Sequence, residues 1–207
     1  MSSDRRTLNR LATRQKISNV ATRLFLEKGF EQVTIDEIAA EAGVGRMTVF
    51  NHFPRKEDMF FDREEEGLEM LRSALNLRET GVGPVEALRR FAHQLVEQHS
   101  PVVAFSVAGQ GFVSTIEKSE ALKARARAIR DEFTQALARE LAGGDLQNPD
   151  TQLAASLLLA TWSAALIQAH RHFSKTLDNA AAAGVFLNLI DRGSAGVLAA
   201  MSGTAYG

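Results

Sequence analysis

The sequence predicts an all-α protein, and two observations carry that prediction. Apolar residues recur at intervals of three and four along most of the chain, as at Ile17, Val20, Ala21, Leu24 and Phe25, which is the spacing of one buried helix face. No segment alternates apolar and polar residues as a half-buried strand would, and no internal repeat is present. Glycines and prolines divide the chain into segments of helical length.

Composition narrows the class of protein. The 207 residues are 45% apolar and 24% charged, with no cysteine, which suits a substantial core under a soluble surface. Without cysteine there can be no disulfide, thiol nucleophile or cysteine-bound zinc, and a reducing compartment fits. The polar amino terminus lacks the apolar segment of a signal peptide. We therefore expect a cytoplasmic protein.

One apolar stretch bears on membrane association. Residues 153–167 are apolar with few interruptions, but this stretch of about 15 residues is shorter than the roughly 20 needed to cross a bilayer. We interpret it as a buried helix and expect no membrane partner.

Charge is distributed unevenly between the two ends of the chain. Residues 1–60 contain 10 Lys and Arg against 8 Asp and Glu, whereas the remainder has 14 against 17, and the net charge is −1. The first 24 residues hold six basic residues against one acidic residue, namely Arg5, Arg6, Arg10, Arg14, Lys16 and Arg23 against Asp4. Such a basic arm suits contact with phosphates, which is salt-dependent and independent of sequence. The alternative is a solvated tail.

Residues 34–56, TIDEIAAEAGVGRMTVFNHFPRK, predict two short helices crossing at a tight turn. Thr34 and Glu37 have the spacing of a capping box, and Gly43 stands where a left-handed residue would end the first helix. A second helix follows from about Arg46 to Phe53, with Val49 and Phe53 expected to face the core. This arrangement is a helix-turn-helix, in which the second helix can enter the major groove of DNA.

The remaining segments are expected to be helices that form a body behind this small head. A long helix from Lys56 to about Leu77 would join the head to the body. Further helices are expected over about 84–99, 102–116, 120–141, 151–173 and 177–201, with a loop at 143–149 and a frayed tail at 202–207. We expect a DNA-binding domain at 1–55 and a larger helical body at 56–207.

The run from Ile17 to Met59 resembles the DNA-binding head of TetR-type transcriptional regulators. A first helix is followed in order by Gly-Phe, Thr-Ile-Asp-Glu-Ile-Ala, Ala-Gly-Val, Thr-Val-Phe-Asn-His-Phe-Pro and Lys-Glu-Asp-Met. The resemblance covers about a fifth of the chain. It implies a DNA-binding regulator, most often a repressor in this family, that binds a palindromic operator as a dimer and is released by a small-molecule effector.

The resemblance also implies which residues contact DNA. In the family the second motif helix enters the major groove, and the matching positions here are Thr34, Arg46, Met47, Thr48, Phe50, Asn51, His52 and Lys56. Arg46 could donate two hydrogen bonds to guanine, a contact that contributes about 1–3 kcal/mol of discrimination. Thr34 and Lys56 match phosphate-binding positions, and Thr48 and His52 match positions that bind phosphate or base edges.

Three departures from the family pattern affect this site. Phe50 replaces a usual Tyr, so a phenolic hydrogen bond to phosphate is missing. Gly45 replaces a frequent Ser. Arg55 occupies a usual Ser or Asn capping position, and its side chain cannot accept from helix N–H groups. These departures concern affinity and operator sequence.

The family's body implies a homodimer formed by the last two helices, and an effector cavity. Small residues at 154–155, 164–165, 180–183 and 195–200 allow helices to approach closely, although packing within one subunit needs the same residues. The candidate cavity residues are Phe91, Phe105, Gln110, Phe112, Phe133, Trp162, Leu166, Gln168 and His170, with His172 as a further polar candidate. Each aromatic residue could instead belong to an ordinary core.

Other functions have less support from the sequence. The chain has no nucleophile-elbow motif and no glycine-rich phosphate loop, so we expect no enzyme. His170 and His172 are two positions apart on a helix and point to different sides, and we expect no metal site and no cofactor. The alternatives are an all-helical small-molecule carrier or a protein-interaction module without DNA binding, and a DNA-binding protein with a filled core.

Overall fold

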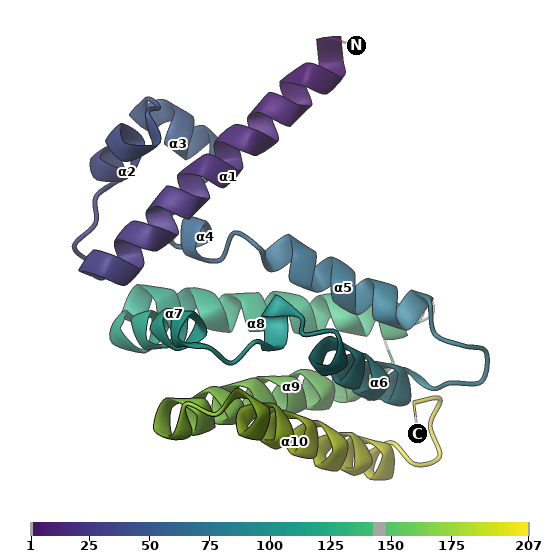
Figure 1. Cartoon of the computed structure of the whole chain (residues 1–207). Coiled ribbons are helices and arrows are strands. Elements are labelled where there is room, and N and C mark those ends of the chain that lie inside the picture. The colour runs from purple at the N-terminus through teal and green to yellow at the C-terminus, as the bar shows by residue number, and fades with distance from the viewer. Residues whose placement is uncertain (1, 143–147, 207) are drawn as a thin grey trace. The chain divides into compact units, whose positions relative to one another are not determined.

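The computed structural model describes residues 2–142 and 148–206, and within these ranges every regular element is a helix. The all-α prediction is confirmed. The predicted loop at 143–149 falls mainly on residues outside the described ranges. The described elements are α1 Ser2–Lys28, α2 Ile35–Ala42, α3 Arg46–His52, α4 Lys56–Phe60, α5 Glu64–Asn76, α6 Pro84–Glu97, the 3-10 helix η1 Pro101–Val103, α7 Val107–Lys118, α8 Glu120–Leu141, α9 Pro149–Thr176 and α10 Asn179–Ala200 (Figure 1).

The chain folds into two compact units. The first, which we call the head, consists of residues 1–64 and 114–125; the second, the body, consists of residues 65–113 and 126–207. Helices α1 to α4 belong to the head, and α6, α9 and α10 belong to the body, whereas α7 and α8 contribute residues to both. The head therefore includes α4 and the corner between α7 and α8 in addition to the segment expected from the sequence.

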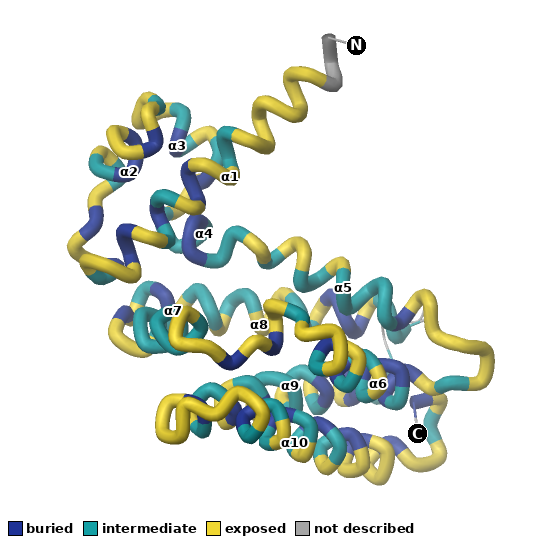
Figure 2. Tube along the Cα trace, viewed as in Figure 1, coloured by how far each residue is buried: buried dark blue, intermediate teal, exposed yellow. Residues whose placement is uncertain are grey.

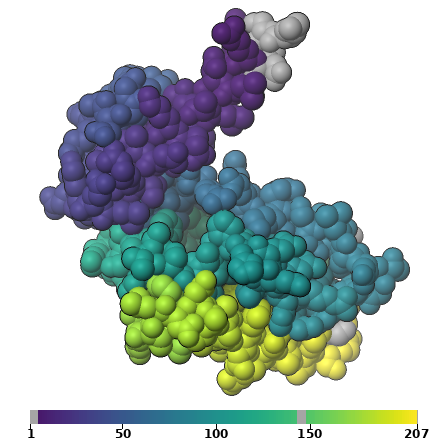
Figure 3. Space-filling view, viewed as in Figure 1, coloured from purple at the N-terminus to yellow at the C-terminus, as the bar shows by residue number. Residues whose placement is uncertain are grey.

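Helix α1 includes the basic arm. It runs without interruption to Lys28 and ends at Gly29, whose φ of +88° is a conformation that glycine adopts easily. Its first turns stand clear of α2 and α3 within the head (Figures 1 and 3). The described side chains of residues 5–12 are exposed (Figure 2). The arm is thus a solvated extension of a helix.

Aromatic rings hold the head together. Phe25 on α1 lies 4.9 Å from Phe30 and 6.0 Å from Phe60 between ring centroids. Ile17 and Ala21 on the same face are fully buried, as are Val49 and Phe53 from the second motif helix. The helical spacing that the sequence showed in this segment therefore marks the face of α1 that packs on the motif, and Val49 and Phe53 face the core as predicted.

The predicted continuous helix from Lys56 to about Leu77 is wrong. Helix α4 ends at Phe60 and α5 begins at Glu64. The buried Ser18 hydroxyl on α1 is hydrogen-bonded to the Asp62 carboxylate, and it also lies 3.3 Å from the Met59 carbonyl oxygen. Because the Ser18 hydroxyl contacts both the Met59 carbonyl and the Asp62 carboxylate, residues 59–62 are held against α1. Helical periodicity on either side of the break gave no sign of it.

Helices α9 and α10 lie side by side in the body (Figure 1). They approach closely where Gly193 faces Thr161, since a Cβ atom at Gly193 would lie 2.2 Å from the Thr161 side chain. Two clusters of buried apolar residues fill the body: one contains Leu75, Leu88 and Leu137, and the other contains Phe105 and Phe186. Gly193 thus fixes the spacing of the two helices that cover both clusters.

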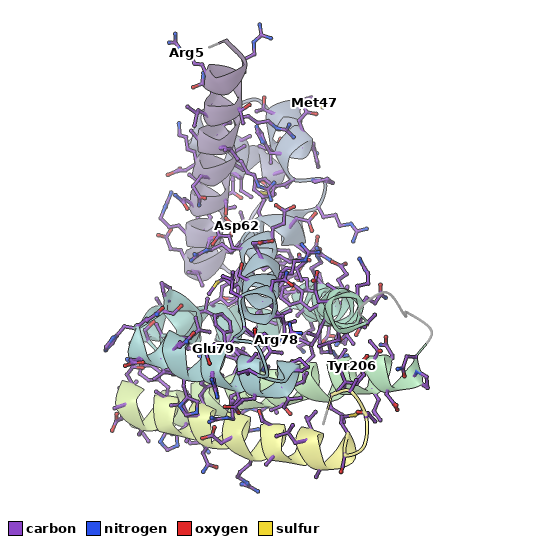
Figure 4. The ribbon with its side chains drawn as sticks, turned by 90° about the vertical axis from the view of Figure 1, so that its right-hand side faces the viewer. Arg5, Met47, Asp62, Arg78, Glu79 and Tyr206 are labelled. Atoms are coloured by element: carbon purple, nitrogen blue, oxygen red, sulfur yellow. The ribbon has the colours of Figure 1, made fainter. Side chains whose placement is uncertain are left out.

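The prediction of a frayed tail at 202–207 is wrong for residues 202–206. Tyr206 is buried, with 7% of its surface exposed, and its hydroxyl lies 2.6 Å from the Thr151 hydroxyl. The Thr204 hydroxyl donates to the Met201 carbonyl at 2.7 Å. A single aromatic residue with a polar partner is enough to dock this segment on the body, where Figure 4 shows the Tyr206 side chain.

Helix α9 is, by length and composition alone, apolar enough to cross a membrane, and it is the one helix of this kind among the described residues. Core helices of soluble proteins pass the same test. Its inner side contacts the body core through Leu158, Ala165 and Phe173, all buried. About 28% of its most apolar window is buried, so an apolar outer side remains exposed.

Candidate nucleic-acid interface

The local sequence builds the helix-turn-helix as predicted. The Thr34 hydroxyl accepts from the Glu37 backbone N–H at 3.2 Å, and the Glu37 carboxylate accepts from the Thr34 N–H at 2.9 Å. These contacts form the expected capping box. Gly43 has a φ of +63° and ends α2. The hydrogen bond from Thr34, followed by that from Lys28, holds the pKa of Glu37 below its usual value.

Helix α3 presents one buried side and one exposed side. Val49 is fully buried, whereas Arg46, Met47 and Asn51 are exposed. Met47 has 70% of its surface exposed and lies on the outside of the head (Figure 4). Arg46 and Met47 precede Phe50 and Asn51 by one helical turn. The sequence therefore correctly separates the core side of α3 from the side that is open to a partner.

The other predicted contact residues are only partly exposed. Thr48, Phe50 and His52 are half-buried, and the Thr34 hydroxyl already serves the cap of α2. Burial, and then the charges of Arg10 and Arg14, lower the pKa of His52. A lowered pKa keeps the imidazole neutral at pH 7.

Lys56 is engaged within the head. Its ammonium donates to the Phe30 carbonyl and lies 4.3 Å from the centroid of the Phe30 ring. Burial lowers the pKa of Lys56. An ammonium has three donors, so this contact leaves others for a phosphate, while it ties the start of α4 to the end of α1. A phosphate contact at Lys56 stays a prediction.

Arg14, which the sequence analysis placed in the basic arm, binds the end of α3. Its guanidinium donates to the His52 carbonyl at 2.6 Å and lies 4.1 Å from the centroid of the Phe53 ring. The side chain thereby caps the carboxyl end of α3 and holds it on α1, where a cation is favoured. Its position on the polar flank of α1 gave no separate signal in the sequence.

The corner between α7 and α8 belongs to the head through three polar contacts. The Ser119 hydroxyl donates to the Glu31 carboxylate at 2.6 Å. Arg125 binds Asp58 at 3.2 Å and Glu64 at 2.7 Å, and all three of these side chains are less than a quarter exposed. Within the head, this ion-pair cluster therefore connects the start of α8 to α4 and to the start of α5.

The body contains an apolar cavity of about 260 Å³. Four of the predicted ligand residues line it: Phe91, Phe133, Trp162 and Leu166. Arg130 and Ser163, which the sequence analysis did not name, are the polar side chains of its described lining, and Met70, Leu71, Leu88, Leu95, Ile129, Leu158 and Leu159 are among the apolar ones. Phe91 and Trp162 are stacked with ring centroids 6.0 Å apart.

The other predicted ligand residues lie outside this lining: Phe105, Gln110, Phe112, Gln168 and His170. Phe105 is buried in the core and packs edge-on against the His170 ring, at 5.1 Å. Burial lowers the pKa of His170, and its Nδ1 atom is buried without a hydrogen-bond partner among the described residues. Gln168 is exposed. Helical spacing could not separate cavity-lining aromatic residues from core ones.

A second hollow of about 690 Å³ lies between α5 and α6. Its lining carries Glu66, Glu69, Arg78, Glu79 and Arg90 (Figure 4 labels Arg78 and Glu79), and it shares Met70 and Phe91 with the apolar cavity. Charged and open to solvent, this hollow offers less apolar contact than the smaller cavity does.

Comparison with known proteins shows what the head is similar to. The sequence model of bacterial regulatory proteins of the tetR family matches residues 17–62, which span α2, α3 and α4 and the second half of α1. The head is therefore similar to the heads of tetR-family regulatory proteins. An HTH-type transcriptional regulator of Staphylococcus aureus strain bovine RF122 is 39% identical over 51 residues, or 25% of this chain. The match spans only 28% of that relative's length.

Solved structures extend the likeness to the whole fold. The SmeT–triclosan complex superimposes with a TM-score of 0.59 at 20% identity, covering 91% of each chain. NalD, the secondary repressor of the MexAB-OprM multidrug efflux pump in Pseudomonas aeruginosa, gives 0.57 at 20% identity, covering 89% of this chain and 97% of its own. At these identities the likeness shows the fold alone, and it covers the body as well as the head.

The departures from the tetR-family pattern have structural consequences here. Arg55 precedes α4 without a side-chain cap, and the Asp58 carboxylate instead accepts from the Arg55 N–H at 3.2 Å. Gly45 likewise gives α3 no side-chain cap. Phe50 lies with its ring centroid 5.6 Å from the Arg46 guanidinium carbon, so the ring that replaces tyrosine accompanies an arginine on the exposed side.

Proposed function

We propose that this protein is a ligand-responsive transcriptional regulator that binds a palindromic operator as a homodimer. The observation that carries the proposal is the exposed outer side of α3, with Arg46, Met47 and Asn51, on a helix-turn-helix whose inner side is buried. A helix of this kind places its first residues at base edges in the major groove. Repression is favoured by the family and by the likeness to NalD, which is a repressor.

The contacts divide into two kinds. Arg46 reads guanine, Met47 offers apolar contact such as to a thymine methyl group, and Asn51 reads a neighbouring base edge. A second set of residues contacts the sugar-phosphate backbone of the DNA and fixes the position of the head. This set consists of Thr34, Thr48, His52, Lys56 and the ring of Phe50. The exposed arginines of the first turns of α1 add salt-dependent affinity that does not depend on sequence.

A homodimer is supported by the exposed sides of α9 and α10. On α9 these sides carry Leu153 and Ile167, about half exposed, with the exposed Ala164 between them. On α10 a Cβ atom at Gly184 would meet nothing within 4 Å. The small residues that serve packing inside one body are different ones, namely the buried Ala154, Ala155, Ala165 and Ala182. An apolar exposed side remains for a second copy.

The effector proposed for the apolar cavity is a compact, largely apolar molecule with one or two polar groups. The cavity of about 260 Å³ is slightly smaller than the roughly 300–1,000 Å³ of drug-sized sites. Stacked rings of Phe91 and Trp162 line it, while Ser163 and Arg130 supply its polar contacts. Within residues 2–142 and 148–206, the Arg130 guanidinium has one ion pair, an exposed contact with Asp131 at 3.4 Å, so it can turn to an acceptor on the effector.

Helix α8 is the proposed route from effector to DNA. Ile129 and Phe133 line the cavity and follow Arg125 by one and two helical turns, and Arg125 binds Asp58 and Glu64 in the head. A ligand that displaces this part of α8 would shift the ion-pair cluster and the heads with it. Coupling of about 1–3 kcal/mol would change DNA affinity 5- to 150-fold.

Salt-dependent binding to duplex DNA tests the proposal against the alternatives. A labelled duplex recovered by selection from a random pool should bind with an affinity that falls steeply between about 50 and 200 mM salt. A cytoplasmic small-molecule carrier or a protein-interaction module would bind no duplex at any salt concentration. A DNA-binding protein with a filled core would bind DNA but show no ligand response in the same assay.

A further inference from the structure

The first residue of α3 is held in place by an acidic residue of α2. The Arg46 Nη1 atom lies 2.8 Å from Oδ2 and 3.0 Å from Oδ1 of Asp36. Asp36 is the second residue of α2, and both side chains are more than half exposed. The Arg46 guanidinium carbon also lies 5.6 Å from the centroid of the Phe50 ring, one turn further along α3.

Stability does not explain this contact. Ion pairs between exposed side chains contribute little to folding, because both ends are well solvated and lose side-chain freedom. A carboxylate on the DNA-facing side also repels phosphates, which reduces affinity for any duplex. Asp36 therefore stabilises the fold little and lowers affinity for DNA in general, so its contact with Arg46 is expected to have another effect.

The geometry of the guanidinium indicates that role. Asp36 engages Nη1 only, and among the described residues no acceptor engages Nε or Nη2 of Arg46. These two nitrogens form one flat edge of the guanidinium, and that edge can donate to N7 and O6 of guanine. An arginine whose orientation is fixed in advance loses less side-chain freedom on binding.

We propose that Asp36 is a specificity-determining residue that positions Arg46 for guanine and keeps it from binding phosphates. This inference rests on the proposed DNA-binding function. Phe50 completes the arrangement, since its ring packs along the guanidinium where a tyrosine would carry a phosphate-binding hydroxyl. Asp36 thus lowers affinity for all sequences and raises the preference for guanine at one position of each half-site. Specificity is a difference between affinities, so the loss common to all sequences cancels and the base preference depends on the positioning of Arg46.

The test uses the full-length protein and the variant Asp36→Asn, which keeps the size and removes the charge. Affinities are measured for the selected duplex and for duplexes carrying each other base at the guanine position. The wild-type preference at that position should be about 5- to 150-fold. In Asp36→Asn the preference should fall at least threefold, while affinity for random-sequence duplex rises.

Glu41→Gln is the matched control. Glu41 lies on the same helix, is about half exposed and pairs with Arg23 on α1 at 2.6 Å rather than with Arg46. The Glu41→Gln variant removes the same charge as Asp36→Asn, so its affinity for random-sequence duplex should also rise. Its base preference should not change. An unchanged base preference in Asp36→Asn, or an equal loss in Glu41→Gln, would overturn the role of Asp36 while leaving DNA binding intact. A wild-type protein that binds no duplex would overturn the proposed function itself, and this inference with it.

A double variant separates positioning from direct contact. If Asp36 acts through Arg46, then adding Asp36→Asn to Arg46→Ala should cause no further loss of base preference, because the residue to be positioned is gone. A further loss in the double variant would show that Asp36 contacts a base by itself, and would overturn the positioning role. Thermal unfolding of each variant should stay within a few degrees of the wild type.

Discussion

The head and the body are both helical, yet their functional groups are held in opposite ways. In the head, polar side chains such as Arg14, Lys56 and Ser18 are bound to backbone or side-chain partners, and the proposed function depends on the few exposed side chains of α3. In the body, the proposed function depends on space left between apolar side chains, around Phe91 and Trp162. A contact surface is defined by residue identity, whereas a cavity is defined by packing.

The largest effect on operator affinity is expected from a change in the body that removes the proposed dimer. Gly184→Arg places a long charged side chain where the single subunit has open space, so the fold should survive while a second copy is excluded. Loss of the two-site contact should lower operator affinity by about 10²- to 10⁴-fold. Light scattering gives the oligomeric state, and a binding titration gives the affinity.

Gln135→Arg is the control for this variant, because it adds the same charge at an exposed position of α8. It should leave both quantities unchanged. A Gly184→Arg protein that remains dimeric would remove the exposed side of α10 from the proposed interface.

A second change tests the head alone. Arg46→Ala should lower affinity for the selected operator about 5- to 150-fold, since it removes a bidentate base contact, and should leave effector binding in the body unchanged. Arg127→Ala removes an equal charge from an exposed site on α8 and should have little effect. Equal losses in both variants would mean that Arg46 contributes only general charge.

A third change tests the cavity. Trp162→Ala removes half of a stacked pair and should destabilise the body by about 2 kcal/mol, below the range for fully buried aromatic residues because Trp162 is half-buried. It should also abolish the effector response without changing operator affinity in the absence of effector. Denaturant unfolding measures the first effect. Unchanged stability together with an unchanged effector response would remove Trp162 from both roles.

A smaller effect is expected at the carboxyl terminus. Tyr206→Phe keeps the ring and removes the hydroxyl that bonds Thr151 at 2.6 Å. Because Thr151 is buried, its hydroxyl loses a partner, and unfolding should become easier by about 1–2 kcal/mol. Thr204→Val, which removes a more exposed hydroxyl from the same segment, should cost less. Equal stability of Tyr206→Phe and wild type would contradict a docked tail.

The smallest expected effect is a pH dependence of the body. Burial lowers the pKa of His170 below its ordinary value of 6.5, so as the pH falls through 6.5 the unfolded chain takes up this proton first. The free energy of unfolding should therefore decrease as the pH falls from 6.5 to the lowered pKa. In His170→Leu this decrease should be smaller. A wild-type slope in His170→Leu would exclude His170 as the source.

The sequence predicted the parts of the molecule that depend on local chemistry. Thr34, Glu37 and Gly43 form the cap and turn that their spacing indicated, because such contacts are made within a few residues. The break between α4 and α5 was missed, since it depends on Ser18, which is 44 positions from Asp62. Helical periodicity places apolar residues on a buried face, but it does not tell a residue beside a cavity from one in a filled core.

The same distinction holds within the proposed site. Arg46 was found from its place in the motif, whereas Asp36 and Arg14 were not, because their roles come from contacts across helices. In the body, Phe133 and Trp162 line the cavity while Phe105 belongs to the core. Both kinds of residue have the same spacing in the sequence.

Selection of bound duplexes from a random pool tests the central claim most directly. Two copies of α3 in successive major grooves should recover a palindrome whose half-sites are about one helical turn, 34–36 Å, apart, with guanine at one fixed position of each half. Recovery of no enriched sequence, or of a single unrepeated half-site, would contradict a symmetric regulator that reads DNA through α3.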